Sequence, residues 1–505
     1  MGQLVRWLRL RGVAVAILAS LVFARPVAAQ LPEAEDAFTH GEYHLARLLY
    51  DSVLAQDSLN PRALYRLAIL DSWDGKLQRS LARFVILRRV EPGDLDIMVA
   101  QARVLSWAGR QRDAEALYDS VLAAAPGRVD ALAGRARTIA WGGDLVRAER
   151  LWREALQAHP DEPEILAGLA QTLYWEGSPT LAEGYVARAV ELAPDDQTAR
   201  ELYQRVRAEH RPVVAVSTDG ANDIEHNSAI SVTGSFAASL RDDLRGTLQG
   251  TWRRNEDVAG RADRSEGLDG WLVKQIRGGA SLRAGAGLHR LDPDSGLSRT
   301  LAAAQLGAAL RPAPFAVVHL GYGHYAFDET TELVRRGYVW DELEATLDLS
   351  PQPALDLSAA ANIGWLSDGN RRLIGTAAAM VGIWRGLHVG AYARALGYRE
   401  EHPGQGYFAP GRYLVGEGRA AYDWRHQSWS ARATAGLGVQ QVGSAGATQA
   451  EYHGDLTLAK SWRAVDELAL VALFTNSAAA AGRTGTQARE QYRYWSFGVR
   501  YRVGL

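Results

Sequence analysis

The chain has 505 residues, 23% of them charged, and a formal net charge of -2. A chain with this mixed and nearly balanced charge lacks the polybasic surface that nucleic-acid binding needs, so nucleic acid is excluded as a partner. Cysteine is absent, which excludes disulfides, thiolate metal sites, thiol nucleophiles and lipid attachment through an N-terminal cysteine.

Residues 1–29 have the pattern of a cleaved signal peptide. Arginines at positions 6, 9 and 11 precede an apolar stretch over residues 12–23, and small residues at Val27–Ala29 precede Gln30. The apolar stretch is shorter than the ~20 residues of a membrane-spanning helix, and no later window reaches that length. We therefore expect the mature chain to leave the cytoplasm and, if it enters a membrane, to cross it as strands.

Residues 30–210 carry an internal repeat. A tryptophan returns every 34 residues and a glycine follows it two places later. The repeated positions are Trp73, Trp107, Trp141 and Trp175 with Gly75, Gly109, Gly143 and Gly177. Each unit reads as two helices, with the glycine permitting the turn between them and a proline ending the second. The small residues Ala114, Ala148 and Ala182 share one repeat position with Ser80, and bulky Phe84, Tyr118, Trp152 and Val186 follow four residues later.

These units resemble the tetratricopeptide repeat, which implies an α-solenoid and interaction with other proteins. The common pattern has a tryptophan within the first helix of each repeat, whereas here the tryptophans stand at the end of that helix. We expect them to pack between repeats, against the following turn, and the alternative is an aromatic platform for a sugar or peptide. We expect the first repeat to be shortened by signal cleavage. Residues 195–209, with Leu202 and Val206 apolar among charges, predict a capping helix.

Residues 211–505 predict a transmembrane antiparallel β-barrel. Segments of about ten residues alternate between apolar and polar positions and are separated by turn residues. The clearest is 429–440, where odd positions are apolar and even positions are polar. Such alternation also fits a soluble sandwich, but long and numerous strands, polar loops and a final strand favour a barrel. We expect about 16 strands, with 14 as the alternative.

The last strand resembles the C-terminal signal that the outer-membrane assembly machinery recognises. Ser496 and Gly498 stand on the polar face, and Tyr501 and Val503 alternate on the apolar face. The departure from the pattern is the chain end, where Gly504 and Leu505 replace the usual aromatic residue. The combination of signal peptide, Trp-x-Gly repeats and barrel resembles the YaiO family of outer-membrane proteins, whose architecture is similar to exporters of cellulose and poly-N-acetylglucosamine. The resemblance implies an outer-membrane location with the repeats in the periplasm, and it carries no catalytic residue.

The sequence shows no catalytic motif, so we expect neither an enzyme nor a cofactor nor a metal site. His319 and His324 are separated by an odd number of residues and should point to opposite faces of a strand. The alternation places charge in the barrel interior; the possible lumen-lining residues are Arg245, Arg253, Arg283, Glu342, Glu344, Arg394, Glu417, Arg419, Arg432, Arg500 and Arg502. This lining predicts either ion pairs that stiffen the wall or a polar track for a hydrated saccharide, and Tyr392 and Trp340 are expected inward.

Three functions remain open from the sequence. The first is a docking and passage component for envelope polysaccharide. The second is a non-transporting outer-membrane anchor whose repeats bind a periplasmic protein. The third is a barrel-embedded lipid-modifying enzyme, for which no convincing pair of serine and histidine is found. Expected partners are outer-membrane lipid, the assembly machinery, and a polysaccharide or periplasmic protein at the repeats.

Overall fold

The structure is a computed structural model that describes residues 27–224, 226–276, 279–313, 315–352, 354–402, 404–444, 446–463, 465–477 and 492–505. All but the last three residues of the predicted signal peptide lie outside these ranges. Contacts divide the chain into two units, Met1–Gly168 and Leu169–Leu505, which are described separately. Across the described residues, helices fall short of the length and apolar character needed to span a membrane.

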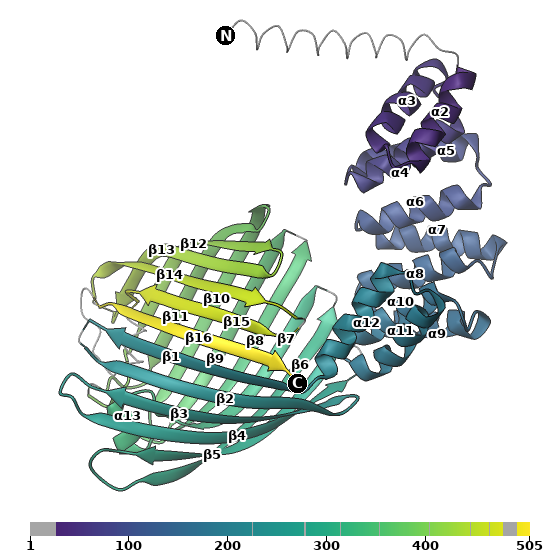
Figure 1. The fold of residues 1–505 in the computed structure, drawn as a ribbon. Coiled ribbons are helices and arrows are strands. Elements are labelled where there is room, and N and C mark those ends of the chain that lie inside the picture. The colour runs from purple at the N-terminus through teal and green to yellow at the C-terminus, as the bar shows by residue number, and fades with distance from the viewer. Residues whose placement is uncertain are drawn as a thin grey trace, which may run out of the picture. The chain divides into compact units, whose positions relative to one another are not determined.

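The first unit consists of paired helices (Figure 1). Each pair packs side by side because both helices have an apolar stripe, and buried residues recur along one face of each. The helices are α2 (Val27–Thr39), α3 (Tyr43–Gln56), α4 (Pro61–Trp73), α5 (Leu77–Val90), α6 (Leu95–Trp107), α7 (Gln111–Ala124), α8 (Val129–Trp141), α9 (Leu145–Ala158) and the start of α10 (Pro163–Trp175). The first repeat is the pair α2 and α3, in which Gln30 is buried and accepts a hydrogen bond from Ser52. Helix α2 begins at Val27, inside the predicted signal peptide, so the expected cleavage after Ala29 would remove its first three residues.

Glycine closes the turn inside each repeat for a conformational reason. Gly75, Gly109, Gly143 and Gly177 have φ of 73°, 75°, 87° and 80°, which is the left-handed region that other residues rarely adopt. The turn that the spacing predicts is therefore present in all four repeats.

Size matching between neighbouring repeats fixes how closely their helices approach. Tyr118 and Trp152 are almost fully buried, and each faces a glycine sixteen residues later. A methyl group at Gly134 would lie 2.4 Å from Tyr118 Cζ, and one at Gly168 would lie 2.4 Å from Trp152 Cη2. The shared small position is filled by Ser80, Ala114 and Ala148, all fully buried. The large side chain of one repeat thus fits against the glycine of the next repeat, where a side chain would leave no room for it.

The second unit begins within α10 and includes α11 (Pro179–Leu192) and α12 (Gln197–His210). Asp196 caps α12 by accepting hydrogen bonds from the backbone N–H groups of Thr198 and Ala199. Leu202 and Val206 are buried on the face of α12 that packs with α11. The expected terminal helix is therefore present, and the change from helix to strand falls between His210 and Val213.

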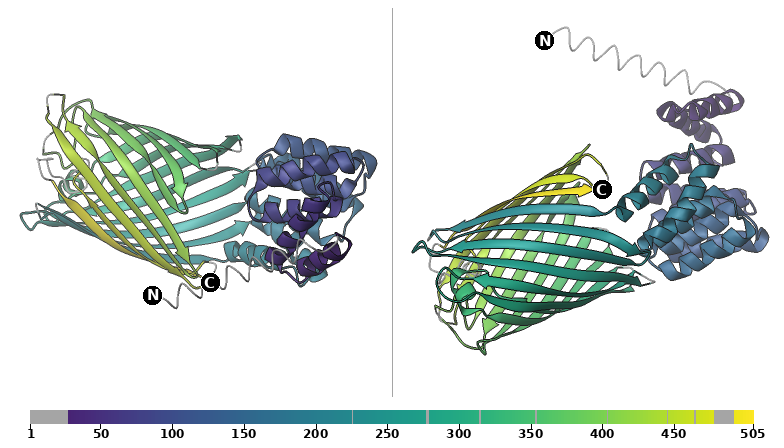
Figure 2. Two further views of the ribbon diagram at one scale, coloured as in Figure 1. Left: turned by 90° about the horizontal axis from the view of Figure 1, so that it is seen from above. Right: turned by 60° about the horizontal axis from the view of Figure 1, so that its bottom comes forward.

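The rest of the second unit is a closed antiparallel barrel, in which β1 pairs with β16 (Figures 1 and 2). Sixteen strands are present, as the main prediction had it, and not fourteen. They are β1 (Val213–Asp223), β2 (Ser228–Arg241), β3 (Leu244–Glu256), β4 (Ala262–Ile276), β5 (Ala280–Asp292), β6 (Arg299–Ala313), β7 (Ala316–Ala326), β8 (Val339–Gln352), β9 (Leu355–Leu366), β10 (Arg371–Trp384), β11 (Leu387–Tyr398), β12 (Tyr413–His426), β13 (Trp429–Val442), β14 (Thr448–Ser461), β15 (Glu467–Thr475) and β16 (Tyr494–Gly504).

The two ends of the barrel differ in their connections. At the end where β1 starts and β16 finishes, strands are joined by short turns such as residues 385–386 and 427–428. The opposite end has the long connections 327–338 and 399–412, and the first of these contains the short helix α13 (Thr331–Arg336). Long loops at one end and short turns at the other are typical of outer-membrane barrels.

Candidate functional site

The strand register divides the barrel residues into an inner and an outer face. Residues paired across strands share a face, so the face can be followed around the closed sheet. The face with buried charges, including Asp263 and Glu417, is the inner one. The outer face carries apolar side chains with large exposed fractions, such as Leu437 (73%) and Phe497 (65%).

The register places every sequence-predicted lumen residue on the inner face. These residues are Arg245, Arg253, Arg283, Glu342, Glu344, Arg394, Glu417, Arg419, Arg432, Arg500 and Arg502. Tyr392 and Trp340 share that face with them. His319 lies on the inner face and His324 on the outer face, so the two histidines do not meet.

Ion pairs join some of these charges within the wall. Arg432 Nε lies 2.7 Å from Asp423 Oδ1, and Arg419 Nε lies 2.5 Å from Glu417 Oε1. Arg372, a residue that the sequence analysis did not single out, lies 2.7 Å from Glu342. The inner wall carries charges of both signs, and these ion pairs partly neutralise them.

Arginines also stack on aromatic rings in the lumen. The guanidinium carbon of Arg419 lies 3.5 Å from the centre of the Tyr392 ring, and that of Arg372 lies 3.7 Å from the Trp340 ring. Arg283 stacks in the same way over Trp271, at 4.6 Å. Cation–π contacts hold the rings and guanidinium groups in fixed orientations along the inner wall.

The connection 327–338 crosses the inside of the barrel at its long-loop end. On one side Arg335 Nη2 lies 2.9 Å from the buried Asp263 of β4. On the other side Thr330 Oγ1 donates to the Gly406 carbonyl in the connection between β11 and β12, at 2.9 Å. This segment therefore links the wall at β4 to the connection that joins β11 and β12, which lie on the far side of the barrel in the strand order. We call residues 327–338 the plug segment.

The plug segment is held by an apolar cluster. Leu333 is fully buried and packs with Trp340, Tyr398, Tyr407 and Tyr413. Tyr407 donates a hydrogen bond of 2.6 Å to Asp368. Burial and this carboxylate raise the pKa of Tyr407 well above its usual value, so it remains a donor. Next to this cluster is a cavity of about 390 Å³ with Arg253, Arg372 and Arg394 in its wall.

The sequence did not reveal the plug segment, because a helix of six residues in a loop has no periodic signal. The sequence likewise did not predict that Glu451 and His453 lie close to Glu417. These residues come from β12 and β14, which are not adjacent, and only the register places them together.

The repeats of the first unit form a groove of about 600 Å³. Its wall contains two of the repeated tryptophans, Trp73 and Trp107, together with Tyr65, Arg66 and Arg103. The four tryptophans keep exposed fractions between 40% and 53%. Trp73 packs on Phe38 and Tyr43, with ring centres 5.7 and 5.3 Å apart.

The packing partner of Trp73 therefore differs from the expected one. Phe38 and Tyr43 precede Trp73 in the chain, whereas packing against the following turn was expected. Trp73 is the last residue of α4 and packs on the aromatic rings at the turn of the preceding repeat. Its remaining surface contributes to the groove.

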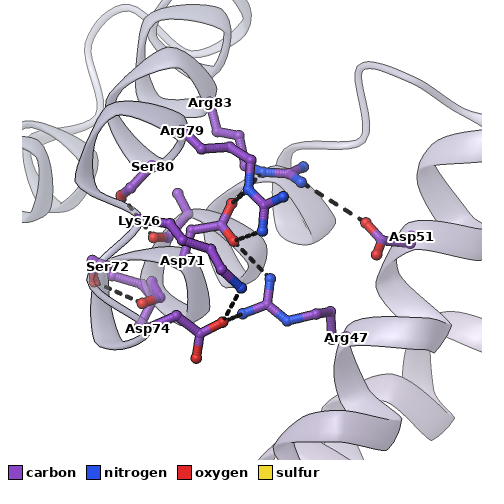
Figure 3. Close-up of polar contacts among 11 residues, drawn as sticks. Arg47, Asp51, Asp71, Ser72, Asp74, Lys76, Arg79, Ser80 and Arg83 are labelled. Atoms are coloured by element: carbon purple, nitrogen blue, oxygen red, sulfur yellow. Dashed lines mark hydrogen bonds and ion pairs between the residues drawn. The ribbon is translucent and has the colours of Figure 1, made fainter.

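A buried aspartate joins three helices of the first two repeats (Figure 3). Asp71 of α4 is fully buried and accepts from Arg47 of α3 and from Arg79 and Arg83 of α5, at 2.7 to 2.9 Å. Burial would raise the pKa of Asp71, but the three arginines outweigh it and lower the pKa. The later repeats have Leu105, Ile139 and Leu173 at this position, and that break in the pattern is the sequence signal that was missed.

The predicted assembly signal has the expected alternation in β16. Ser496 and Gly498 lie on the inner face, and Tyr501 and Val503 lie on the outer face. Gly498 is needed where it stands, because a methyl group there would lie 2.3 Å from Asp219 Oδ1 of β1. Strand β16 therefore closes the barrel by pairing with β1 and presents apolar residues on its outer face.

The fold and site define a class: tetratricopeptide repeats followed by a closed 16-stranded antiparallel β-barrel with a polar interior. A tetratricopeptide-repeat family model matches residues 142–206. None of the curated proteins compared matches this sequence.

Solved structures similar to this chain include a bacterial polysaccharide outer membrane secretin. It is 14% identical, with 58% of this chain and 99% of that chain covered and a TM-score of 0.46. A thermophilic tetratricopeptide-repeat protein of Thermus thermophilus is 23% identical over 36% of this chain and 99% of its own, with a TM-score of 0.32. A tetratricopeptide-repeat protein with an unusual peptide-binding site is 16% identical, covering 35% and 91%, with a TM-score of 0.28.

Proposed function

We propose that this protein is an outer-membrane barrel of the YaiO type whose repeats lie in the periplasm. In this proposal it has no enzymatic activity and serves as a docking and passage component for envelope polysaccharide. The observation that carries the proposal is the inner wall of the closed barrel, where charged side chains alternate with fixed aromatic rings such as Tyr392 and Trp340.

The outer face supports the membrane part of the proposal. Closure pairs the backbone of β1 with that of β16, so no sheet edge meets lipid. Apolar side chains such as Leu268, Leu437 and Phe497 project outward with most of their surface exposed, which is favourable only in an apolar medium. Short turns face the periplasm in outer-membrane barrels, and β1 follows the repeats at that end.

The inner wall supports a saccharide as the passing molecule. A hydrated sugar needs hydrogen-bonding groups for its hydroxyls and flat apolar faces for its rings, and the lumen offers both. Barrels of 16 to 18 strands are wide enough to leave an aqueous channel. Passage in this protein would require the plug segment to move, because it bridges β4 and the connection between β11 and β12.

The groove of the first unit supports the docking part of the proposal. Half-exposed Trp73 and Trp107 and the arginines beside them offer stacking and hydrogen bonds to a peptide or a sugar. The partner proposed here is either the polymer itself or a periplasmic protein that delivers it.

A second function, a non-transporting anchor, is favoured by the plug segment. Its buried Leu333 and the ion pair from Arg335 to Asp263 are features of a permanently filled barrel. In that case the repeats alone carry the function. The third possibility, a lipid-modifying enzyme, would require turnover of lipid substrates by the purified protein in micelles, and we expect none.

Conductance in planar bilayers distinguishes passage from anchoring. We expect small or rare openings for the native protein and a large, stable pore when residues 328–337 are replaced by a short Gly-Ser turn. Replacement of the exposed residues 295–297, in the connection between β5 and β6 at the same end, is the matched control and should change conductance little. Neutral oligosaccharides should reduce the current through the opened pore. If the barrel still conducts no current after removal of the plug segment, the result would support the anchor and contradict passage.

A further inference from the structure

Two carboxylates and an imidazole form a buried cluster on the inner face of β12 and β14. Glu417 comes from β12, and Glu451 and His453 come from β14. Their ligand-type atoms all lie within 4.8 Å of one another. Glu417 is 7% exposed and Glu451 is 4% exposed. In the described part of the chain, no other group of three such side chains comes this close.

The intervening strand leaves room for this cluster. In the register, Gly438 of β13 lies between Glu417 and Glu451, and Gly436 lies opposite His453. A methyl group at Gly436 would lie 2.2 Å from His453 Cε1 and 2.7 Å from Glu417 Oε2. Strands two apart are separated by roughly 10 Å. The side chains of β12 and β14 meet only because β13 contributes no side chain between them.

The spacing of the polar atoms suits a bound cation. His453 Nδ1 lies 3.1 Å from Glu417 Oε2 and 3.8 Å from Glu451 Oε1. Two ligand atoms that are each about 2.1 Å from one metal ion are about 3.0 to 3.4 Å apart at octahedral or tetrahedral angles. The first spacing falls within this range, and a small rotation of Glu451 brings the second into it.

Two carboxylate oxygens of the cluster lack a hydrogen bond of regular geometry. Glu417 Oε2 and Glu451 Oε2 are both buried without one. The other oxygen of Glu417 accepts from Arg419, which stacks on Tyr392, and this directs Oε2 towards His453. A protonated imidazole would give one donor at Nδ1 and leave the other oxygen unpaired. A cation bound to both carboxylates would satisfy both.

We propose that Glu417, Glu451 and His453 form a binding site for a divalent transition-metal ion of the Zn²⁺ class. One imidazole nitrogen with two carboxylates favours such ions over Ca²⁺ and Mg²⁺, which prefer oxygen ligands alone. A bound ion would join β12 to β14 across β13. Its remaining coordination positions would face the lumen and accept water or an oxygen of a passing molecule. This site does not depend on the proposed function.

Cobalt binding to the purified full-length protein in detergent micelles tests the site. Co²⁺ should bind at one ion per chain with visible absorption bands, and Zn²⁺ should displace it whereas Ca²⁺ and Mg²⁺ should not. His453→Gln and Glu451→Gln should each weaken Co²⁺ binding by about 100-fold or more, since even losing a partner of a ligand costs about 10- to 100-fold. His289→Gln is the matched control, because His289 of β5 pairs with Asp269 in the lumen without a third ligand.

A variant that leaves the three ligands intact separates loss of the metal site from misfolding. Gly436→Ala should block the ion by filling the space between His453 and Glu417, whereas Gly307→Ala, an inner glycine of β6 whose nearest neighbours would be 3.5 Å away, should not. Folding of each variant is checked by heat-dependent gel migration. Absence of Co²⁺ binding by the native protein, or binding that His453→Gln and Gly436→Ala leave unchanged, would overturn the site in favour of a closed ion-pair cluster around protonated His453.

Discussion

At the scale of the residue, function and stability depend on a few positions where the repeat pattern changes. Asp71 replaces an apolar residue and joins three helices through Arg47, Arg79 and Arg83. Gly168 replaces a side chain so that Trp152 fits between helices. In both cases the residue contacts side chains of other helices, so a substitution here should affect more than its own helix.

Gly168→Ala should destabilise the repeats by about 1 to 3 kcal/mol. The added methyl group would meet the buried Trp152 ring at 2.4 Å, and overpacking outweighs the gain in helix propensity. Gly184→Ala is the matched control in helix α11, where nothing lies within 4 Å, and it should be neutral or stabilising. Urea unfolding of residues 31–209, followed by circular dichroism, compares the two. Equal stability of both variants would contradict the size matching.

Acid should weaken the first repeats as Glu35 becomes protonated. Burial would raise the pKa of Glu35, but hydrogen bonds from Arg66, Tyr50 and Arg62 bring it down to about 2. Because the folded pKa lies below the unfolded one, this stabilisation is present above about pH 4.5 and is lost as pH falls towards 2. Glu35→Gln should flatten that loss in unfolding measured between pH 5 and 2. An unchanged pH profile in the variant would assign the acid sensitivity to other groups.

At the scale of the element, β16 closes the barrel and carries the predicted assembly signal. It pairs with β1 and β15, its inner face carries Arg500 and Arg502, and its outer face carries Tyr501 and Val503. Alternation gives neighbouring residues opposite surroundings, so two adjacent substitutions report on the orientation of the whole strand.

Tyr501→Asp should reduce outer-membrane insertion strongly, whereas Arg500→Asp should be tolerated. The first variant places a carboxylate on the apolar outer face, where Tyr501 packs near Trp462 and where charge opposes insertion into lipid. The second changes a residue of the polar lumen. The levels of both proteins in the outer-membrane fraction are compared side by side. Equal levels, or selective loss of Arg500→Asp, would show that the faces of β16 are reversed.

At the scale of the whole molecule, the chain combines a helical repeat domain with a barrel whose sheet is closed. The strands pair with sequence neighbours except where β1 meets β16, so closure depends on the two ends of the barrel sequence finding each other. Such closed barrels resist unfolding by detergent because every strand is paired on both sides.

The full-length protein should therefore migrate faster on a denaturing gel before heating than after heating, and it should be recovered with outer membranes. Heating is needed to separate the sixteen paired strands. Fractionation of cells that express the natural chain, with and without boiling of the samples, is the measurement. Recovery in the soluble periplasmic fraction without a heat shift would contradict the membrane assignment.

The sequence by itself determined the periodic features of this protein. A repeat of 34 residues predicted helix pairs joined by glycine turns, and alternation predicted about sixteen strands with the inner and outer faces seen in the structure. These features are local, because a side chain's face follows from its distance along the chain.

Only the tertiary structure decided which distant residues meet. It brought Glu417 to Glu451 and His453 across a strand with no side chain between them, and it linked the plug segment to β4 and to the connection between β11 and β12. It also turned Trp73 towards Phe38 in the preceding repeat. These contacts depend on register, closure and the size of neighbouring side chains, which are properties of pairs of segments and leave no periodic trace in either segment alone.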